Sequence, residues 1–243
     1  MGEREERVAL LAGASGLAGG HLLGALLEAP DFARVYAVTR RPLGREHPRL
    51  ANRIVPFDRL EQQLKGVVCH TAFCCLGAAP EQTPDEAREV ELGYVLAFAR
   101  AAKAARAERF VFLSCVGAQA DARKTHLRVK QEAERALEGV GFVSLDILQP
   151  GPLVGIRREI RSADLLALGH AAFLSLTSFG ERAVQRGISA RTVANAMLGA
   201  ARSGRRGVYR NTYSGIGMLA RSKFRAQPAR TPVLSTGPRP PSG

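Results

Sequence analysis

The chain has 243 residues, 46% of them hydrophobic, which is enough to enclose one full core, so we expect a single α/β domain over residues 1–220. No apolar run approaches the length that a bilayer-spanning helix needs, so we expect no membrane partner. The formal net charge of +13 comes almost wholly from residues 182–243, which hold 12 basic and no acidic residues; no stacking-aromatic pattern accompanies it, so nucleic-acid binding is disfavoured.

The first predicted element is a strand over residues 8–12 (VALLA), which runs into a glycine-rich turn and a helix-compatible segment at residues 21–29. Gly13 can take a tight turn, Gly16 lets the backbone approach a pyrophosphate, and Gly19 lets the helix lie close to its strand. An anion would lie at the helix N-terminus, where free N–H groups and the helix dipole favour negative charge. The same glycines also serve ordinary turns, so the elements that follow must decide between the two interpretations.

Two arginines follow the second predicted strand, residues 34–39 (RVYAVT). An acidic residue at this place would accept hydrogen bonds from the ribose 2′-hydroxyl of NAD, whereas guanidinium groups suit the 2′-phosphate of NADP. Arg40 and Arg41 therefore predict that NADPH is preferred over NADH. The alternative is a pair of solvated loop arginines in an arginine-rich chain.

The remaining apolar runs alternate with helical patterns. Helices are predicted at residues 86–107 and 123–137, and strands at residues 53–57, 67–76, 109–114 and 142–148. This alternation is typical of a doubly wound parallel sheet with helices on both faces. Such sheets bind ligands at the carboxyl ends of their strands, where Gly13, Arg40, Gly77, Ser114 and Pro150 would gather.

The alternation weakens beyond residue 151. We expect helices at residues 163–175 and 189–201, the second capped by Ser189, on the substrate side of the domain. Residues 221–243 combine Pro, Gly, Ser and Arg without a hydrophobic period and predict a basic, disordered tail.

The four cysteines, Cys69, Cys74, Cys75 and Cys115, all fall in apolar, strand-like segments. Neither their spacing nor nearby histidines suggest a zinc site, and we expect no bound metal. Cys74 and Cys75 would point to opposite faces of a strand, which disfavours a disulfide between them. Free thiols, and an N-terminus that does not read as a secretion signal, predict a cytoplasmic protein.

Several motifs in order resemble the atypical short-chain dehydrogenases/reductases, and among them the TIP30-like (Tat-interacting protein) NAD(P)H-binding oxidoreductases. The resemblance covers nearly all of residues 7–200. Its motifs are LLAGASGLAGG, AFCCLGAA from residue 72, RFVFLSCVGA from residue 109, LRVKQEAE from residue 127, LDILQPGPLVGIRRE from residue 145 and ISARTVANAML from residue 188.

The resemblance implies a Rossmann-type fold that binds NADPH, and it implies a place for each cofactor-binding residue. The pyrophosphate would be held by Gly13, Ser15, Gly16, Leu17 and Gly19. The other contacts would be Arg40 and Arg41 to the 2′-phosphate, Asp58 on the adenine side, Leu76 and Gly77 at the ribose, Lys130 at the nicotinamide ribose, and Pro150 beside it.

The chain departs from this family at the catalytic position. Short-chain dehydrogenases use a Tyr-x-x-x-Lys pair, in which the lysine lowers the pKa of the tyrosine that exchanges the proton. Lys130 stands at the lysine position, but His126 replaces the tyrosine, on the same face of a helix. His126 is then either a general acid/base with altered reach or a surface histidine. Ser114, or less directly Cys115, takes the place of the serine that orients the carbonyl.

Three functions are compatible with these residues. The first is an NADPH-dependent oxidoreductase that acts on a small carbonyl or alcohol. The second is an NADPH-binding regulatory protein that senses the redox state and acts through a protein partner. A relative of nucleotide-sugar epimerases is disfavoured, because about seventy residues follow Pro150 before the tail, which makes such a pocket cramped. The partners compatible with these functions are a small-molecule substrate and either a protein partner or a second copy of the chain in a homo-oligomer.

Overall fold

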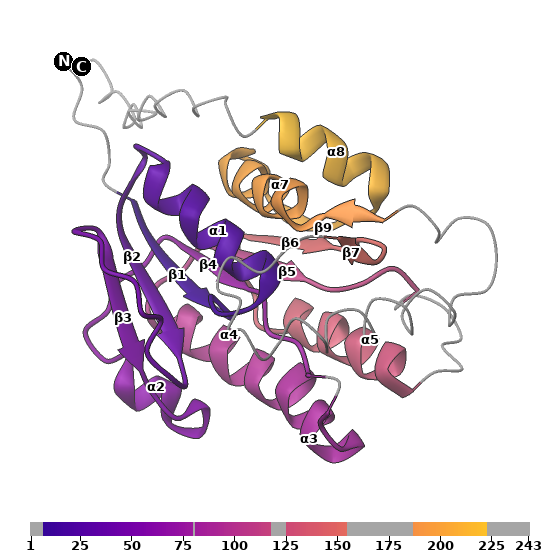
Figure 1. Ribbon diagram of the computed structural model, residues 1–243, viewed down its shortest axis with the longest axis horizontal. Helices are drawn as coiled ribbons and strands as arrows, with labels where there is room; N and C mark the ends of the chain where they lie inside the picture. Colours follow the sequence, from indigo (N-terminus) through magenta and orange to yellow (C-terminus); the bar gives the residue numbers. More distant parts are fainter. Residues whose placement is uncertain (1–6, 80, 118–124, 155–186, 223–243) are drawn as a thin grey trace, which may run out of the picture.

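The computed structural model describes residues 7–79, 81–117, 125–154 and 187–222. Seven strands form one sheet in the order β3-β2-β1-β4-β5-β6-β9, with every neighbouring pair parallel (Figure 1). The strand order reverses between β1 and β4, which is the arrangement of a Rossmann-type doubly wound sheet. The strands are β1 Arg7–Ala12, β2 Phe32–Thr39, β3 Leu50–Ile54, β4 Thr71–Cys74, β5 Arg109–Leu113, β6 Ser144–Leu148 and β9 Gly207–Asn211.

Helices cover both faces of this sheet (Figure 1). One face carries α1 Leu17–Glu28 and α7 Ala190–Arg202, with α8 Tyr213–Ser222 packed on α7. The other carries α4 Tyr94–Ala104 and α5 Thr125–Glu138. The shorter elements are a 3-10 turn Phe57–Arg59, α2 Leu60–Gln63, α3 Pro84–Arg88, a π-helical turn Glu89–Gly93 and the strand pair β7 Leu153–Val154 and β8 Ile188–Ser189. The predicted fold class is confirmed.

Consecutive residues of the central strand β1 enter two separate cores. Ala9 and Leu11 pack with α1 and α7, whereas Leu10 and Ala12 pack with the helices of the opposite face. A strand that is buried on both sides must be apolar at every position, which is why residues 8–12 appear as a continuous run. The tandem cysteines follow the same rule: Cys74 belongs to one core and Cys75 packs against the other.

The structure corrects several predicted boundaries. The strand predicted at residues 67–76 is limited to β4, because the Cys69 N–H donates to the Ala105 carbonyl at 2.8 Å at the end of α4. The strand predicted at residues 53–57 lies earlier, at β3. The single helix predicted at residues 86–107 is divided into α3, a π-helical turn and α4.

The C-terminal part contains elements that the sequence analysis did not predict. The helix expected at residues 189–201 is confirmed as α7, and the Ser189 hydroxyl accepts the Thr192 N–H at 3.0 Å as its N-cap. Strand β9 and helix α8 were missed, and Arg221 and Ser222 end α8 rather than begin a disordered tail. The helix expected at residues 163–175, and residues 223–243, lie outside the described residues.

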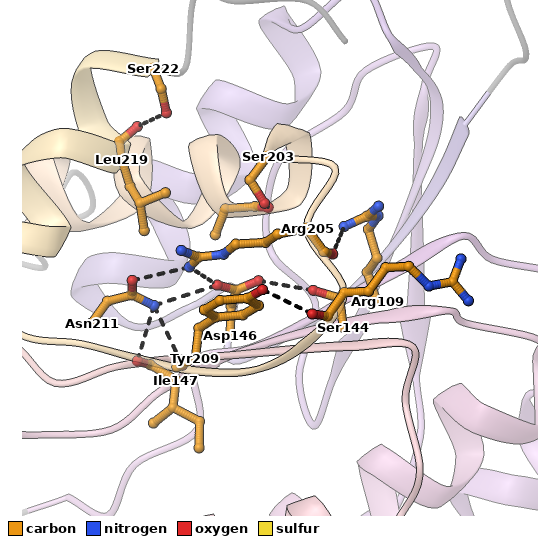
Figure 2. A network of polar contacts seen from close by, with 12 residues as sticks. Arg109, Ser144, Asp146, Ile147, Ser203, Arg205, Tyr209, Asn211, Leu219 and Ser222 are labelled. Carbon is orange, nitrogen blue, oxygen red and sulfur yellow. Dashed lines mark hydrogen bonds and ion pairs between the residues drawn. The ribbon is translucent and has the colours of Figure 1, made fainter. Parts of the chain in front are cut away.

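A buried carboxylate joins β9 to the rest of the sheet (Figure 2). Asp146 of β6 is 1% exposed and forms an ion pair with Arg205, just before β9. Its carboxylate also accepts the Ser144 hydroxyl at 3.2 Å and the Asn211 amide at 3.4 Å. The Arg205 guanidinium lies 4.1 Å from the Tyr209 ring centroid. Because this charge is paired and hydrogen-bonded, Asp146 stabilises the sheet edge and is not a free acid.

Asp31 links the turn after α1 to the end of α7. It forms an ion pair with Arg202, whose Nε donates to Oδ2 at 3.0 Å. Burial raises the pKa of Asp31, but the hydrogen bond and charge of Arg202 outweigh burial, and the net pKa is lowered. A lowered pKa in the folded state means that the carboxylate stabilises the fold above its unfolded pKa. This stabilisation is lost as the pH falls through the folded pKa.

We therefore predict that Asp31→Asn lowers the free energy of unfolding at pH 7 by about 1–2 kcal/mol. Below the ordinary carboxyl pKa of about 4, the difference from the wild type should shrink. Urea unfolding at a series of pH values measures this, with Glu46→Gln as an exposed-acid control. A destabilisation that is the same at every pH would contradict the ion-pair explanation.

Candidate functional site

The turn between β1 and α1 has no room for side chains at two of its glycines. Gly13 has φ +83°, and a Cβ there would lie 2.5 Å from the Cys75 carbonyl oxygen. A Cβ on Gly19 would lie 2.0 Å from the Gly13 carbonyl oxygen. The first is the tight turn and the second the close helix packing that the sequence predicts.

The N-terminus of α1 is open to a ligand at this turn. Gly16 is the N-cap, its N–H donates to the Gly13 carbonyl at 3.0 Å, and it has no side chain that could cap the helix. The first turn of α1, which begins at Leu17, contains no acidic residue. Backbone N–H groups and the positive end of the helix dipole therefore point towards whatever lies above the turn, and both favour an anion.

A pocket lies above this turn, at the carboxyl ends of β1, β2 and β4. Six of the residues that the sequence analysis predicted line it: Gly13, Ser15, Gly16, Arg40, Leu76 and Gly77. Six more were not predicted: Val38, Thr39, Phe57, Cys75, Val90 and Tyr94. The pocket therefore occupies the point where the strand order reverses, which is where doubly wound sheets bind dinucleotides.

The two arginines and Asp58 occupy different places. Arg40 lines the pocket, whereas Arg41 is exposed beside it. Asp58 is exposed, and its carboxylate lies 3.9 Å from the Arg59 Nε. The neighbouring Phe57 lines the pocket instead, with its ring centroid 5.3 Å from that of Tyr94. An aromatic pair thus lines the pocket next to Asp58. Nothing in the sequence distinguishes these two aromatic residues from core residues.

Lys130 of α5 contacts Leu76, a residue that lines the pocket, but does not line the pocket itself. Its Nζ lies 3.3 Å from the Glu91 carboxylate and 3.5 Å from the Leu76 carbonyl oxygen, which it contacts as a donor. Both side chains of the ion pair are nearly buried, at 9% and 12% exposed. Glu91 belongs to the π-helical turn, and π-helical turns occur frequently at functional sites. Glu91 was not predicted, because it is one acidic residue among several in that helical pattern.

Ser114 is buried at the end of β5, and its hydroxyl donates to the Glu134 carboxylate at 2.5 Å. Glu134, one helical turn after Lys130, is 2% exposed. It also accepts the Gln149 amide at 2.9 Å and forms an ion pair with Arg210 at 3.3 Å. A hydroxyl has a single hydrogen, so in this arrangement Ser114 can accept a hydrogen bond from a substrate but cannot donate one.

Pro150 and His126 are the last two predicted site residues. Pro150 is buried and does not line the pocket; its carbonyl accepts the Val116 N–H at 2.9 Å and so joins the ends of β6 and β5. His126 lies in the first turn of α5, four residues before Lys130, and its side chain lies outside the described set.

Cysteine chemistry is disfavoured here. Cys75 lines the pocket, but burial, with a contribution from Cys74, raises its pKa far above the ordinary thiol value. Burial also raises the pKa of Cys115 to about 11. These thiols are protonated at neutral pH, and the thiolate is the nucleophilic form. Within the described part of the chain there is no cluster of three metal-ligating side chains and no helix able to cross a membrane.

The residues present fit a nicotinamide dinucleotide. Gly13 and Gly19 form a cradle that a Cβ would fill, and it lies at a helix N-terminus, which suits one phosphate position. The Arg40 guanidinium suits a second phosphate, and the Lys130 ammonium group suits a ribose. No acidic residue stands among the described residues that line the pocket.

We predict opposite effects for two adjacent glycines of α1. Gly19→Ala drives a Cβ into the Gly13 carbonyl and should destabilise the fold by about 1–3 kcal/mol and weaken cofactor binding. Gly20→Ala meets its nearest neighbour at 3.5 Å and should stabilise α1 by up to about 1 kcal/mol. Thermal unfolding and cofactor titration of both variants measure this. Equal behaviour of the two would show that the helix does not depend on close contact at Gly19.

The chain is similar to one protein family and to several known proteins. Residues 9–137 match the NAD dependent epimerase/dehydratase family. Protein FMP52, mitochondrial, of Saccharomyces cerevisiae is 34% identical over 160 residues, which are 63% of this chain and 69% of that protein. Protein HTATIP2 of Rattus norvegicus is 32% identical over 168 residues, 67% of this chain and 69% of the relative.

Solved structures share the fold. MoeE5 in complex with UDP-glucose and NAD superposes with a TM-score of 0.63 at 20% identity, over 88% of this chain and 81% of that one. A UDP-N-acetylglucosamine 4-epimerase from Methanobrevibacter ruminantium M1 gives a TM-score of 0.62 at 18% identity, over 84% and 76% of the two chains. At these identities the likeness extends to the fold alone.

Proposed function

The chain belongs to the NAD dependent epimerase/dehydratase family, as a TIP30-like atypical short-chain dehydrogenase, and from that premise we propose that it is an NADPH-dependent oxidoreductase of a small carbonyl or alcohol. The observation that carries this proposal is the pocket at the strand-order reversal, lined by the glycine turn, by Arg40 and by no described acidic residue. An acidic side chain would suit the free 2′-hydroxyl of NAD, whereas a guanidinium suits the 2′-phosphate of NADP.

Each part of the cofactor has a proposed partner in the chain. The turn from Gly13 to Gly19, with Ser15 and Leu17, holds the diphosphate at the N-terminus of α1. Arg40 binds the 2′-phosphate from within the pocket and Arg41 from its exposed rim. Asp58 and the aromatic rings near it lie on the adenine side. Leu76, Gly77 and Pro150 border the ribose and nicotinamide, and Lys130 donates to the nicotinamide ribose.

The protein side of the reaction is proton transfer. A nicotinamide cofactor bound in the pocket would supply or accept the hydride. His126 then exchanges the proton with the substrate oxygen, since an imidazole can transfer protons near neutral pH. The pairing of Lys130 with Glu91 keeps its ammonium group in place. Ser114 accepts a hydrogen bond from an alcohol or a water at this site.

We predict that titration with NADPH and NADH will show tighter binding of NADPH. Arg40→Ala combined with Arg41→Ala should weaken NADPH binding by about 10-fold or more, because charge-assisted hydrogen bonds to the phosphate are lost. Binding of NADH, which has no 2′-phosphate, should change little. Fluorescence or calorimetric titration measures both constants. If the wild type binds both cofactors equally and weakly, Arg40 and Arg41 do not indicate a preference for NADPH.

A regulatory protein that binds NADPH without efficient turnover is a second candidate. It is supported by the hydrogen bond from Ser114 to Glu134, which engages the hydroxyl hydrogen that would otherwise orient a carbonyl. The histidine in place of the catalytic tyrosine supports it as well. Such a protein would sense the NADPH pool and act through a protein partner or a second copy of the chain.

His126→Tyr separates the two candidates. If the substrate pocket is functional, restoring the phenol should raise NADPH-dependent reduction of small aldehydes and ketones by about 10-fold or more. His126→Phe, which restores the ring without the hydroxyl, is the matched control and should not. A regulatory protein should show no turnover in either variant, with NADPH affinity unchanged. NADPH consumption across a panel of carbonyl compounds measures this.

We propose a cytoplasmic location from the free thiols. The fungal relatives are named mitochondrial, so an organelle is the alternative. Fractionation of cells that express the full chain distinguishes the two.

A further inference from the structure

Asn52 joins three points around the turn that follows β2. Its Oδ1 accepts the Leu43 N–H at 3.0 Å. Its Nδ2 donates to the Ala37 carbonyl at 3.1 Å and to the Thr39 hydroxyl at 2.7 Å. One acceptor and both donor hydrogens of a single amide are therefore engaged between the end of a strand and the loop beyond it.

The sheet register explains how one side chain reaches both places. Asn52 lies opposite Ala37 in the parallel pair of β2 and β3, two positions before each strand ends. The amide therefore lies under the last residues of β2 and extends towards the turn. Its neighbours Arg53 and Ile54 are exposed and take no part in these contacts, whereas Asn52 is partly buried.

The turn that Asn52 holds carries the two arginines. Thr39 ends β2 and is buried, and Leu43 is buried in the core with α1. Arg40 and Arg41 lie between these two anchored residues, and both are exposed. The backbone of residues 40–42 is thus held at both ends by the same amide, while its side chains remain free to meet a ligand.

This arrangement matters for binding a phosphate. An arginine on a loose turn loses backbone and side-chain freedom when it binds, and that loss weakens binding. A turn that is already held loses less. The benefit applies to the group that the arginines contact and not to the diphosphate, which lies at the N-terminus of α1.

We propose that Asn52 is a positioning residue for cofactor specificity, which holds residues 40–43 so that Arg40 meets the 2′-phosphate of NADPH. This inference rests on the proposed function in one respect, the assignment of NADPH to the pocket. Asn52 does not touch the cofactor and acts through Arg40.

The test is a comparison of dissociation constants for NADPH and NADH, measured by titration of the full chain. Asn52→Ala should raise the constant for NADPH about fivefold or more, because the turn must be ordered on binding. The constant for NADH should stay within about twofold, since NADH has an uncharged 2′-hydroxyl in place of the 2′-phosphate that Arg40 contacts. Gln63→Ala removes an exposed amide on α2 and is the matched control.

A double-variant cycle tests whether Asn52 acts through Arg40. When Arg40→Ala is already present, adding Asn52→Ala should change NADPH affinity by less than about twofold. If Asn52→Ala does not fold, Asn52→Gln provides the same reading, because it keeps the amide but displaces it by one methylene.

The outcomes separate this inference from the function on which it rests. If the wild type prefers NADPH and Asn52→Ala keeps that preference, the role of Asn52 is refuted and the proposed function stands. If Asn52→Ala weakens both cofactors equally, Asn52 is structural only and the inference is again refuted. If the wild type binds NADPH and NADH equally, the cofactor assignment fails, and the inference fails with it.

Discussion

The close contact between α1, the turn after β1 and the end of β4 is the constraint on which the rest of the structure depends. Gly13 and Gly19 have no space for a Cβ, because the Cys75 and Gly13 carbonyl groups already occupy it. This contact places the N-terminus of α1 directly above the sheet. The pocket exists because the backbone at Gly13 approaches the end of β4 more closely than a residue with a Cβ could.

Helix α5 contributes two buried charges beside the ends of β4 and β5. Lys130 and Glu134 lie one turn apart on this helix, and each is buried against a partner of the opposite charge, Glu91 or Arg210. Buried charges remain in a fold only when they are paired and hydrogen-bonded, so these contacts also restrict what the site can do. The ammonium group is held next to the Leu76 carbonyl, and the Ser114 hydroxyl is committed to a carboxylate. In this arrangement the Ser114 hydroxyl hydrogen is therefore not available to another acceptor.

The C-terminal edge of the sheet depends on a polar network in place of a large apolar surface. Val208 of β9 is 46% exposed, and the strand is joined to β6 through Asp146 and Arg205 (Figure 2). On its other face, Arg210 of the same strand pairs with Glu134 and Glu138 of α5. The last strand is thereby coupled to the helix that carries Lys130. Strand β9, the last strand along the described chain, therefore helps to hold α5 against the sheet.

Local patterns in the amino-acid sequence determined the doubly wound sheet, the glycine turn and the end of β2 that carries Arg40, because apolar periodicity and glycine spacing are properties of neighbouring residues. They also determined α7 and its Ser189 cap. They could not reveal β9, since its residues are mostly polar or exposed and only pairing with β6 makes them a strand. Phe57, Tyr94, Glu91, Glu134 and Asn52 resemble ordinary core or surface residues in the chain. Only tertiary structure decided their contacts, because each contact depends on a partner that is distant in sequence, and the distance between two side chains is set by how the strands and helices pack.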